Sequence, residues 1–176
     1  MFATMATMNT TPAPSAAADF DFLVGTWFTQ QRRLKTRLQH CDEWETFDAT
    51  VTMHKLPGGT ANFDTMTAPA WRPGWTGMAL RIFNPATNLW SIFWFTNDGG
   101  GLDAKTGHLE PPVIGRFDGD EGLFEGDDTF DGRPIRVRFC WTRLGADAAR
   151  WQQSFSPDGG QTWEINWTME FARVAA

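Results

Sequence analysis

Residues 122–141 read GLFEGDDTFDGRPIRVRFCW, and this stretch decides the fold class. Asp131-Gly132 is a strong signal for a two-residue hairpin turn, because its central residues accept positive φ. Pairing outward from that turn places Phe130 opposite Arg133 and, further along, alternates apolar and charged rows. The apolar row is Phe124, Val137, Phe139 and Trp141. The charged row is Glu125, Asp127, Arg136 and Arg138, which we interpret as a ladder on the solvent face.

Turn residues of the same kind recur along the chain from Phe20 onward. They cluster at 56–59, 84–88, 118–122 and 156–160, where Pro, Gly, Asn and Asp favour tight turns. Short strands at this spacing are typical of a β-sandwich or β-barrel. We predict an all-β fold, an antiparallel up-and-down β-barrel of about ten strands, with one short helix near 19–24 or 38–42. The expected strands are 26–34, 44–55, 60–67, 76–83, 88–97, 113–118, 122–130, 133–143, 149–156 and 161–173.

Length and charge narrow the class of protein. The 176 residues suit one domain, with residues 1–18 as a disordered N-terminal tail and 19–176 as the barrel. No secretory signal and no long apolar run is present, so we expect a cytoplasmic protein without a membrane partner. The net charge of −6 and the lack of a basic cluster argue against nucleic acid as a partner.

No pattern of reactive residues points to a known chemistry. Cys41 and Cys140 are expected to be free thiols, with a single disulfide as the alternative. There is no pair of His at helical spacing and no phosphate-binding Gly loop. We therefore predict no metal site and no catalytic residue.

One hairpin carries polar residues on its inward face. The turn at 56–59 pairs Val51 with Asp64 and Met53 with Asn62, so Asn62 and Asp64 point inward with the apolar residues. An inward carboxylate is costly unless it is paired, and Arg33 on the face of Trp27 is the expected partner. This group is either a structural ion pair near the barrel mouth or the polar end of a cavity.

The last hairpin contributes a second inward row. Pairing across its turn sets Trp151 opposite Trp167 and places Gln153 inward beside Ile165, where the amide needs a neighbour or a ligand as partner. The expected inward row is Trp163, Ile165, Trp167, Met169 and Phe171. Asn166 and its alternate neighbours are expected to face water.

Strands 76–83 and 88–97 are apolar on both faces. The expected register puts Met78, Leu80 and Ile82 on one face with Trp94, Ile92 and Trp90. The other face then carries Ala79, Phe83, Leu89, Phe93 and Phe95. A lone barrel should not expose such a face to water, so a cover is needed. The loop 98–112 and the tail are candidates, and we favour a homodimer contact through these two strands.

Gly25-Thr26-Trp27 opens the first strand, and Arg173 lies at the end of the last. A Gly-x-Trp at this place resembles the calycin superfamily, which includes lipocalins, fatty-acid-binding proteins and nitrobindins. In lipocalins the Trp closes one end of the barrel under an Arg that follows the last strand, so the resemblance implies a Trp27–Arg173 pair. The stretch from Phe20 to Val174 is similar to a lipocalin-like family of bacteria. The resemblance implies an internal cavity and leaves its ligand open.

The positions of the histidines and the sequence of the last turn can each be compared with a known pattern. Nitrobindins hold haem through a His near the C-terminal strands, whereas the three histidines here are His40, His54 and His108, so we predict no haem and no other cofactor. Residues 156–163 read SPDGGQTW, which is similar to the Asp-box of sialidase-like propellers. It occurs once in a chain too short for a propeller, so we interpret it as a turn that Asp158 caps and Trp163 packs on.

The predicted function is the binding of a small, largely apolar or aromatic molecule inside the barrel. The expected aromatic contacts are Trp90, Trp94, Trp141 and Trp167. The expected polar contacts are Arg33, Asn62, Asp64, Asp128 and Gln153. Two alternatives stay open: an enzyme of this fold that uses Asp64 or Asp128 as acid or base, and an interaction module that acts through the apolar outer patch.

Overall fold

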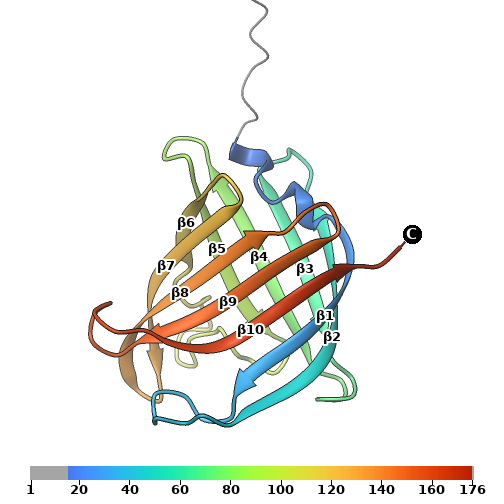
Figure 1. The fold of residues 1–176 in the computed structure, drawn as a ribbon. Helices are drawn as coiled ribbons and strands as arrows, with labels where there is room; N and C mark the ends of the chain where they lie inside the picture. Colours follow the sequence, from blue (N-terminus) through green and yellow to red (C-terminus); the bar gives the residue numbers. More distant parts are fainter. Residues whose placement is uncertain (1–15, 176) are drawn as a thin grey trace, which may run out of the picture.

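A computed structural model describes residues 16–175, which form a closed barrel of ten antiparallel strands (Figure 1). Two short 3-10 helices precede it, η1 (Ala16–Ala18) and η2 (Asp21–Leu23). The strands are β1 (Gly25–Leu34), β2 (Trp44–Lys55), β3 (Ala61–Thr67), β4 (Thr76–Asn84), β5 (Leu89–Thr96), β6 (Val113–Asp118), β7 (Glu121–Phe130), β8 (Arg133–Arg143), β9 (Ala148–Ser156) and β10 (Glu164–Arg173). The predicted fold class is confirmed. Of the predicted tail, residues 1–15 lie outside the described residues and 16–18 form η1.

Each strand pairs with the next along the chain, and β1 pairs with β10 to close the barrel. The two ends of the barrel differ. η1 and η2 lie across the end that carries the turns 56–60, 84–88 and 118–120 (Figure 1), and we call this the closed end. The longer connections 35–43, 68–75 and 97–112 lie at the opposite end, which we call the mouth.

An aromatic plug fills the closed end. Phe20, between the two 3-10 helices, is fully buried, and its ring centroid lies 5.1 Å from that of Trp90 and 5.6 Å from that of Phe124. The Trp90 indole donates to the Ala16 carbonyl over 2.9 Å, which ties η1 to β5. These edge and face contacts pack the rings against one another and leave the closed end solid.

The expected Trp27–Arg173 pair is present at the same end. The Arg173 guanidinium carbon lies 4.1 Å from the Trp27 ring centroid. Its two terminal nitrogens donate to the carbonyls of Val24 and Phe22, at 2.8 and 2.6 Å. The stacked cation therefore joins the end of β10 to the segment before β1 and covers the buried indole.

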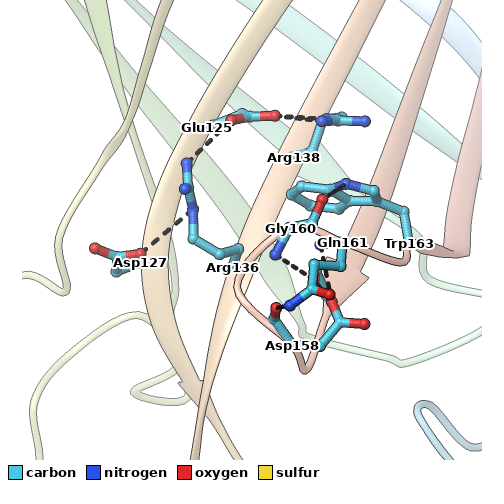
Figure 2. A network of polar contacts seen from close by, with 9 residues as sticks. Glu125, Asp127, Arg136, Arg138, Asp158, Gly160, Gln161 and Trp163 are labelled. Atoms are coloured by element: carbon cyan, nitrogen blue, oxygen red, sulfur yellow. Dashed lines mark hydrogen bonds and ion pairs between the residues drawn. The ribbon is translucent and has the colours of Figure 1, made fainter.

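The hairpin of residues 122–141 has the predicted register, with Phe130 opposite Arg133 and Glu125 opposite Arg138. Figure 2 shows its outer charged face. Glu125 accepts from Arg138 at 2.7 Å and from Arg136 at 3.0 Å, and Asp127 lies 3.4 Å from Arg136. These charges form a surface ladder, as expected.

The Asp-box turn lies beside that ladder (Figure 2). Asp158 accepts from the backbone amides of Gln161 and Thr162, at 3.0 and 2.9 Å, and from the Thr162 hydroxyl at 2.6 Å. The Thr162 hydroxyl and these amides hold the pKa of Asp158 well below its usual range. Trp163 closes the turn with a bond to the Gly160 carbonyl, which confirms the structural interpretation.

A β-bulge in β10 corrects the predicted inward row. The ladder between β9 and β10 slips between Ile165 and Trp167, so Trp151 lies opposite Met169 and Gln153 opposite Trp167. The extra residue reverses the alternation before the bulge. Ile165 is therefore exposed and Asn166 fully buried, the opposite of the expectation. Trp163 lies outside the barrel, where the Arg138 guanidinium carbon is 3.8 Å from its ring centroid.

The register of β4 and β5 is corrected as well. Asn84 pairs with Leu89, which makes the loop one residue shorter than expected. This slip of one residue moves the side chains of β4 to the opposite face, whereas those of β5 keep the expected one. The inward row is Ala79, Arg81, Phe83, Trp90, Ile92 and Trp94. The register of β2 and β3 differs from the expected one by two residues, because Met53 rather than Val51 lies opposite Asp64. A shift of two residues keeps the same face, so Asn62 and Asp64 point inward as expected.

The outer face of β3, β4 and β5 carries an apolar patch. It consists of Phe63, Met78, Leu80, Ile82, Phe93 and Phe95. Leu80 lies at its centre, opposite both Phe63 and Phe93. Within residues 16–175 both cysteines are free, and no helix is long and apolar enough to cross a membrane.

The homodimer through β4 and β5 stays a prediction, and we expect its contact surface to be this apolar patch. We expect Leu80→Glu to convert a dimer into a monomer, because a charge buried at the centre of the interface has no partner. Sedimentation velocity measures the change, with Thr168→Glu on the outer face of β10 as control. A wild-type protein that sediments as a monomer at micromolar concentration would contradict the dimer.

Candidate functional site

Two adjacent cavities lie inside the barrel. The inner cavity is about 50 Å³, is lined mostly by apolar side chains and lies on the plug side of the mouth cavity. The mouth cavity is about 460 Å³ and opens between the long connections. Ile92, Trp94, Phe139, Gln153 and Trp167 line both cavities and so form the floor of the mouth. The barrel is therefore packed at the closed end and hollow at the mouth.

The floor is held rigidly by hydrogen bonds and ring contacts. The Trp167 indole donates to Gln31 Oε1 over 2.7 Å, and the same amide donates to Thr29 Oγ1 over 2.7 Å. The Trp167 ring meets Trp94 and Trp151 edge to face, at centroid distances of 6.2 and 5.9 Å. The aromatic surface is thus fixed before any ligand arrives.

A glycine makes room for one of these rings. A Cβ on Gly77 would lie 2.3 Å from Cη2 of Trp94 and 2.9 Å from the ring of Trp75. Both side chains line the mouth cavity, so the absence of a side chain at 77 allows the two indoles to approach the β4 backbone.

The inner cavity has a charged pair on its wall. Asp64 lies 2.5 Å from Arg81, and Arg81 also donates to Asn62 over 3.1 Å. Both partners of the pair are almost completely buried. Arg81 is the partner of Asp64 because β4 presents it inward; Arg33, the partner expected from the sequence, pairs with Glu45 at 3.2 Å instead.

The inward amide of Gln153 has a protein partner. Its Nε2 donates to Asn166 Oδ1 over 2.8 Å, and the β-bulge is what turns Asn166 toward it. The partner of this amide was expected to be either a neighbouring side chain or a ligand, and the neighbouring side chain of Asn166 supplies the hydrogen bond.

The mouth carries charges of both signs. Arg72 pairs with Asp98 at 2.9 Å, whereas Arg37 has neither a hydrogen bond nor an ion pair within residues 16–175. Burial, reinforced by the nearby charge of Arg33, lowers the pKa of Arg37 to about 10. Burial also raises the pKa of Asp128, which accepts only from the adjacent Thr129 amide.

The structure places the predicted ligand residues in five positions. Arg33 and Asp128 line the mouth alone, and Trp94, Gln153 and Trp167 line its floor. Asp64 and Trp141 line the inner cavity. Asn62 lies behind Arg81, and Trp90 belongs to the plug rather than to either cavity. Ligand binding by these side chains stays a prediction.

Among the lining residues that were not predicted are Arg37, Arg81 and Trp151. Trp151 could have been chosen from its place in the last inward row of the sequence. Arg81 was assigned to the wrong face by the one-residue slip of β4. Arg37 lies in the 35–43 connection, where no periodicity indicates direction. Within the described residues no three His, Cys, Asp or Glu side chains gather as metal ligands.

Comparison with solved structures supports the fold. The barrel is similar to the crystal structure of Rv2717c from M. tuberculosis, with a TM-score of 0.59, 13% sequence identity, and coverage of 93% of this chain and 99% of that one. No family model matches the chain. No curated protein matches it either.

The Asp64–Arg81 pair makes a testable contribution to stability. We expect Asp64→Leu or Arg81→Met alone to lower the free energy of unfolding by about 3–5 kcal/mol, because each leaves an unpaired buried charge. The double variant should lose far less than the sum. Guanidinium denaturation followed by Trp fluorescence measures this, with Arg150→Ala in the exposed pair with Glu170 as control. Additive losses would contradict the pairing.

Asp128 gives a pH-dependent prediction. Its folded pKa lies above that of the unfolded chain, so its contribution to stability falls as pH rises from about 4 through the folded pKa. Asp128→Asn should therefore raise the melting temperature by about 1–3 °C at neutral pH and by less in acid. Thermal unfolding at about pH 4.5 and about pH 7.5 tests this. A variant that melts lower than wild type at neutral pH would contradict it.

Proposed function

We propose that this barrel is a binding protein for a small, largely apolar or aromatic molecule, which occupies the mouth cavity. The observation that carries the proposal is the cavity of about 460 Å³ above a fixed aromatic floor of Trp94, Phe139 and Trp167. Its volume falls within the range of about 300–1,000 Å³ that small-molecule sites occupy. The inner cavity of about 50 Å³ has room only for a small substituent.

Membership of the calycin superfamily is part of the same proposal. Gly25-Thr26-Trp27 opens β1, and Arg173 stacks on Trp27 across the β1–β10 ladder. This is the arrangement that the resemblance to lipocalins implies. In lipocalins the Trp closes one end of the barrel, and here the Trp27–Arg173 pair lies at the end that the plug fills, opposite the mouth cavity.

A neutral fluorescent probe tests the binding function. Phenylnaphthylamine brightens in apolar surroundings and absorbs Trp emission, so binding at the floor should raise its own fluorescence and quench that of Trp. We expect Trp94→Ala to weaken binding by about tenfold through lost ring contact, a difference of about 1.4 kcal/mol. Trp163→Ala is the matched control, because that indole lies outside the barrel.

Two outcomes would contradict a mouth site. One is the absence of any fluorescence change in the wild-type protein. The other is binding that Leu80→Glu abolishes and Trp94→Ala leaves unchanged, which would place the probe on the apolar patch instead. That second result would favour the interaction module over the internal binding site.

A further inference from the structure

The 35–43 connection carries Arg37 into the mouth at a cost in backbone conformation. Leu38 and His40 adopt φ of 57° and 54°, a left-handed conformation that side chains with a Cβ disfavour. The Leu38 amide is fixed by the Glu164 carboxylate, at 2.8 and 3.0 Å from its two oxygens. Such strain persists only where surrounding contacts impose it, and it gathers at functional sites.

The guanidinium of Arg37 lies among aromatic rings without a polar partner. Its central carbon is 5.6 Å from the ring centroid of Phe155, 5.8 Å from that of Trp167 and 5.9 Å from that of Phe130. Its Nη2 is buried and makes no hydrogen bond. A buried donor without a protein acceptor is costly, so Arg37 is held in this place without the hydrogen bond that would offset its burial.

Arg33 repeats the pattern beside it. Its guanidinium carbon is 5.3 Å from the same Trp167 ring, and its Nε is also buried without a partner. The nearby carboxylates are already engaged: Glu45 accepts from Arg33 Nη1 and from the Trp71 indole, both at 3.2 Å, and Glu164 holds Leu38. Two cations thus face one aromatic ring with unused donors.

The acidic residues of the mouth do not neutralise Arg37. Asp98 pairs with Arg72, Asp127 with Arg136, and Asp128 accepts from its neighbouring amide. Glu110 also lines the cavity, yet within the described residues no carboxylate lies at ion-pair distance from Arg37. Glu45 and Glu164 attract Arg37 only from beyond ion-pair distance, so within the described residues its guanidinium has no direct acceptor on the side of the mouth that Trp167 and Phe155 form.

We propose that Arg37 and Arg33 bind the oxyanion of a compact aromatic or apolar organic acid, such as a carboxylate, whose body lies on Trp167. This rests on the proposed function, because the mouth must first bind an apolar body. A planar guanidinium presents paired N–H donors that match a carboxylate, and its face stacks on indole. Both guanidinium groups line the mouth cavity, so an anion that enters it can approach them and offset the desolvation of Arg37.

Two competitors of equal shape separate charge from size. Naphthoate and naphthamide differ by the charge of one group, and each is titrated against bound phenylnaphthylamine. We expect naphthoate to displace the probe at a concentration about 10- to 100-fold lower than naphthamide, the range for hydrogen bonds to a charged group. In Arg37→Gln this preference, measured as the ratio of the two displacing concentrations in the same variant, should fall to about threefold or less.

Arg72→Gln is the matched control, because Arg72 lines the same cavity but already pairs with Asp98. It should keep the preference for naphthoate. Thermal unfolding of Arg37→Met shows whether loss of the cation harms folding. We expect a melting temperature equal to or above that of wild type, because Arg37 makes no ion pair that the substitution would break.

The outcomes are distinguishable. If the wild-type protein binds phenylnaphthylamine but naphthoate and naphthamide displace it equally, the anion site is wrong and the binding function stands. The anion site is also wrong if Arg72→Gln removes the preference as fully as Arg37→Gln. If the wild-type protein binds none of the three compounds, the proposed function itself fails.

Discussion

The ladder between β1 and β10 is the constraint on which the rest of the structure depends. It joins residues at opposite ends of the chain, Trp27 opposite Arg173 and Arg33 opposite Trp167, and thereby removes both open edges of the sheet. Closure divides every strand into an inward and an outward row. A barrel of ten strands is wider than its own side chains fill evenly, so packing must be concentrated somewhere. Here it is concentrated around Phe20 at the closed end.

The polar side chains of the interior are mostly paired with one another. Below the floor, Arg81 meets Asp64, Trp167 meets Gln31, and Gln153 meets Asn166, each within hydrogen-bond or ion-pair distance. Buried donors without a partner occur in both regions: Arg81 Nε and Asn166 Nδ2 in the interior, and Arg33 Nε and Arg37 Nη2 beside the Trp167 ring at the mouth. Arg33 and Arg37 differ in that their side chains line the larger cavity, where the proposed ligand would meet them.

The sequence predicts the fold closely and the site only in part. Asp131-Gly132 sets the register of β7 and β8 because a two-residue turn leaves no freedom. The Asn84–Asn88 turn admits more than one loop length, and an error of one residue exchanged the faces of Arg81 and Leu80. The bulge before Trp167 has no local signal, so Asn166 was placed in water. Arg37 lies in a connection whose course depends on Glu164, which is distant in sequence and adjacent only after folding.

The position of Trp167 links stability to binding. Its indole nitrogen is fixed from within by Gln31, while its ring faces Arg33 and Arg37 at the mouth. The buried plug of Phe20, Trp90 and Phe124 supplies favourable packing that offsets the strained Leu38 and the desolvated Arg37. A barrel selected for stability alone would replace Arg37 by an apolar residue and fill the mouth. This chain keeps both the cation and the space, which is the trade between stability and function that the proposed binding site would require.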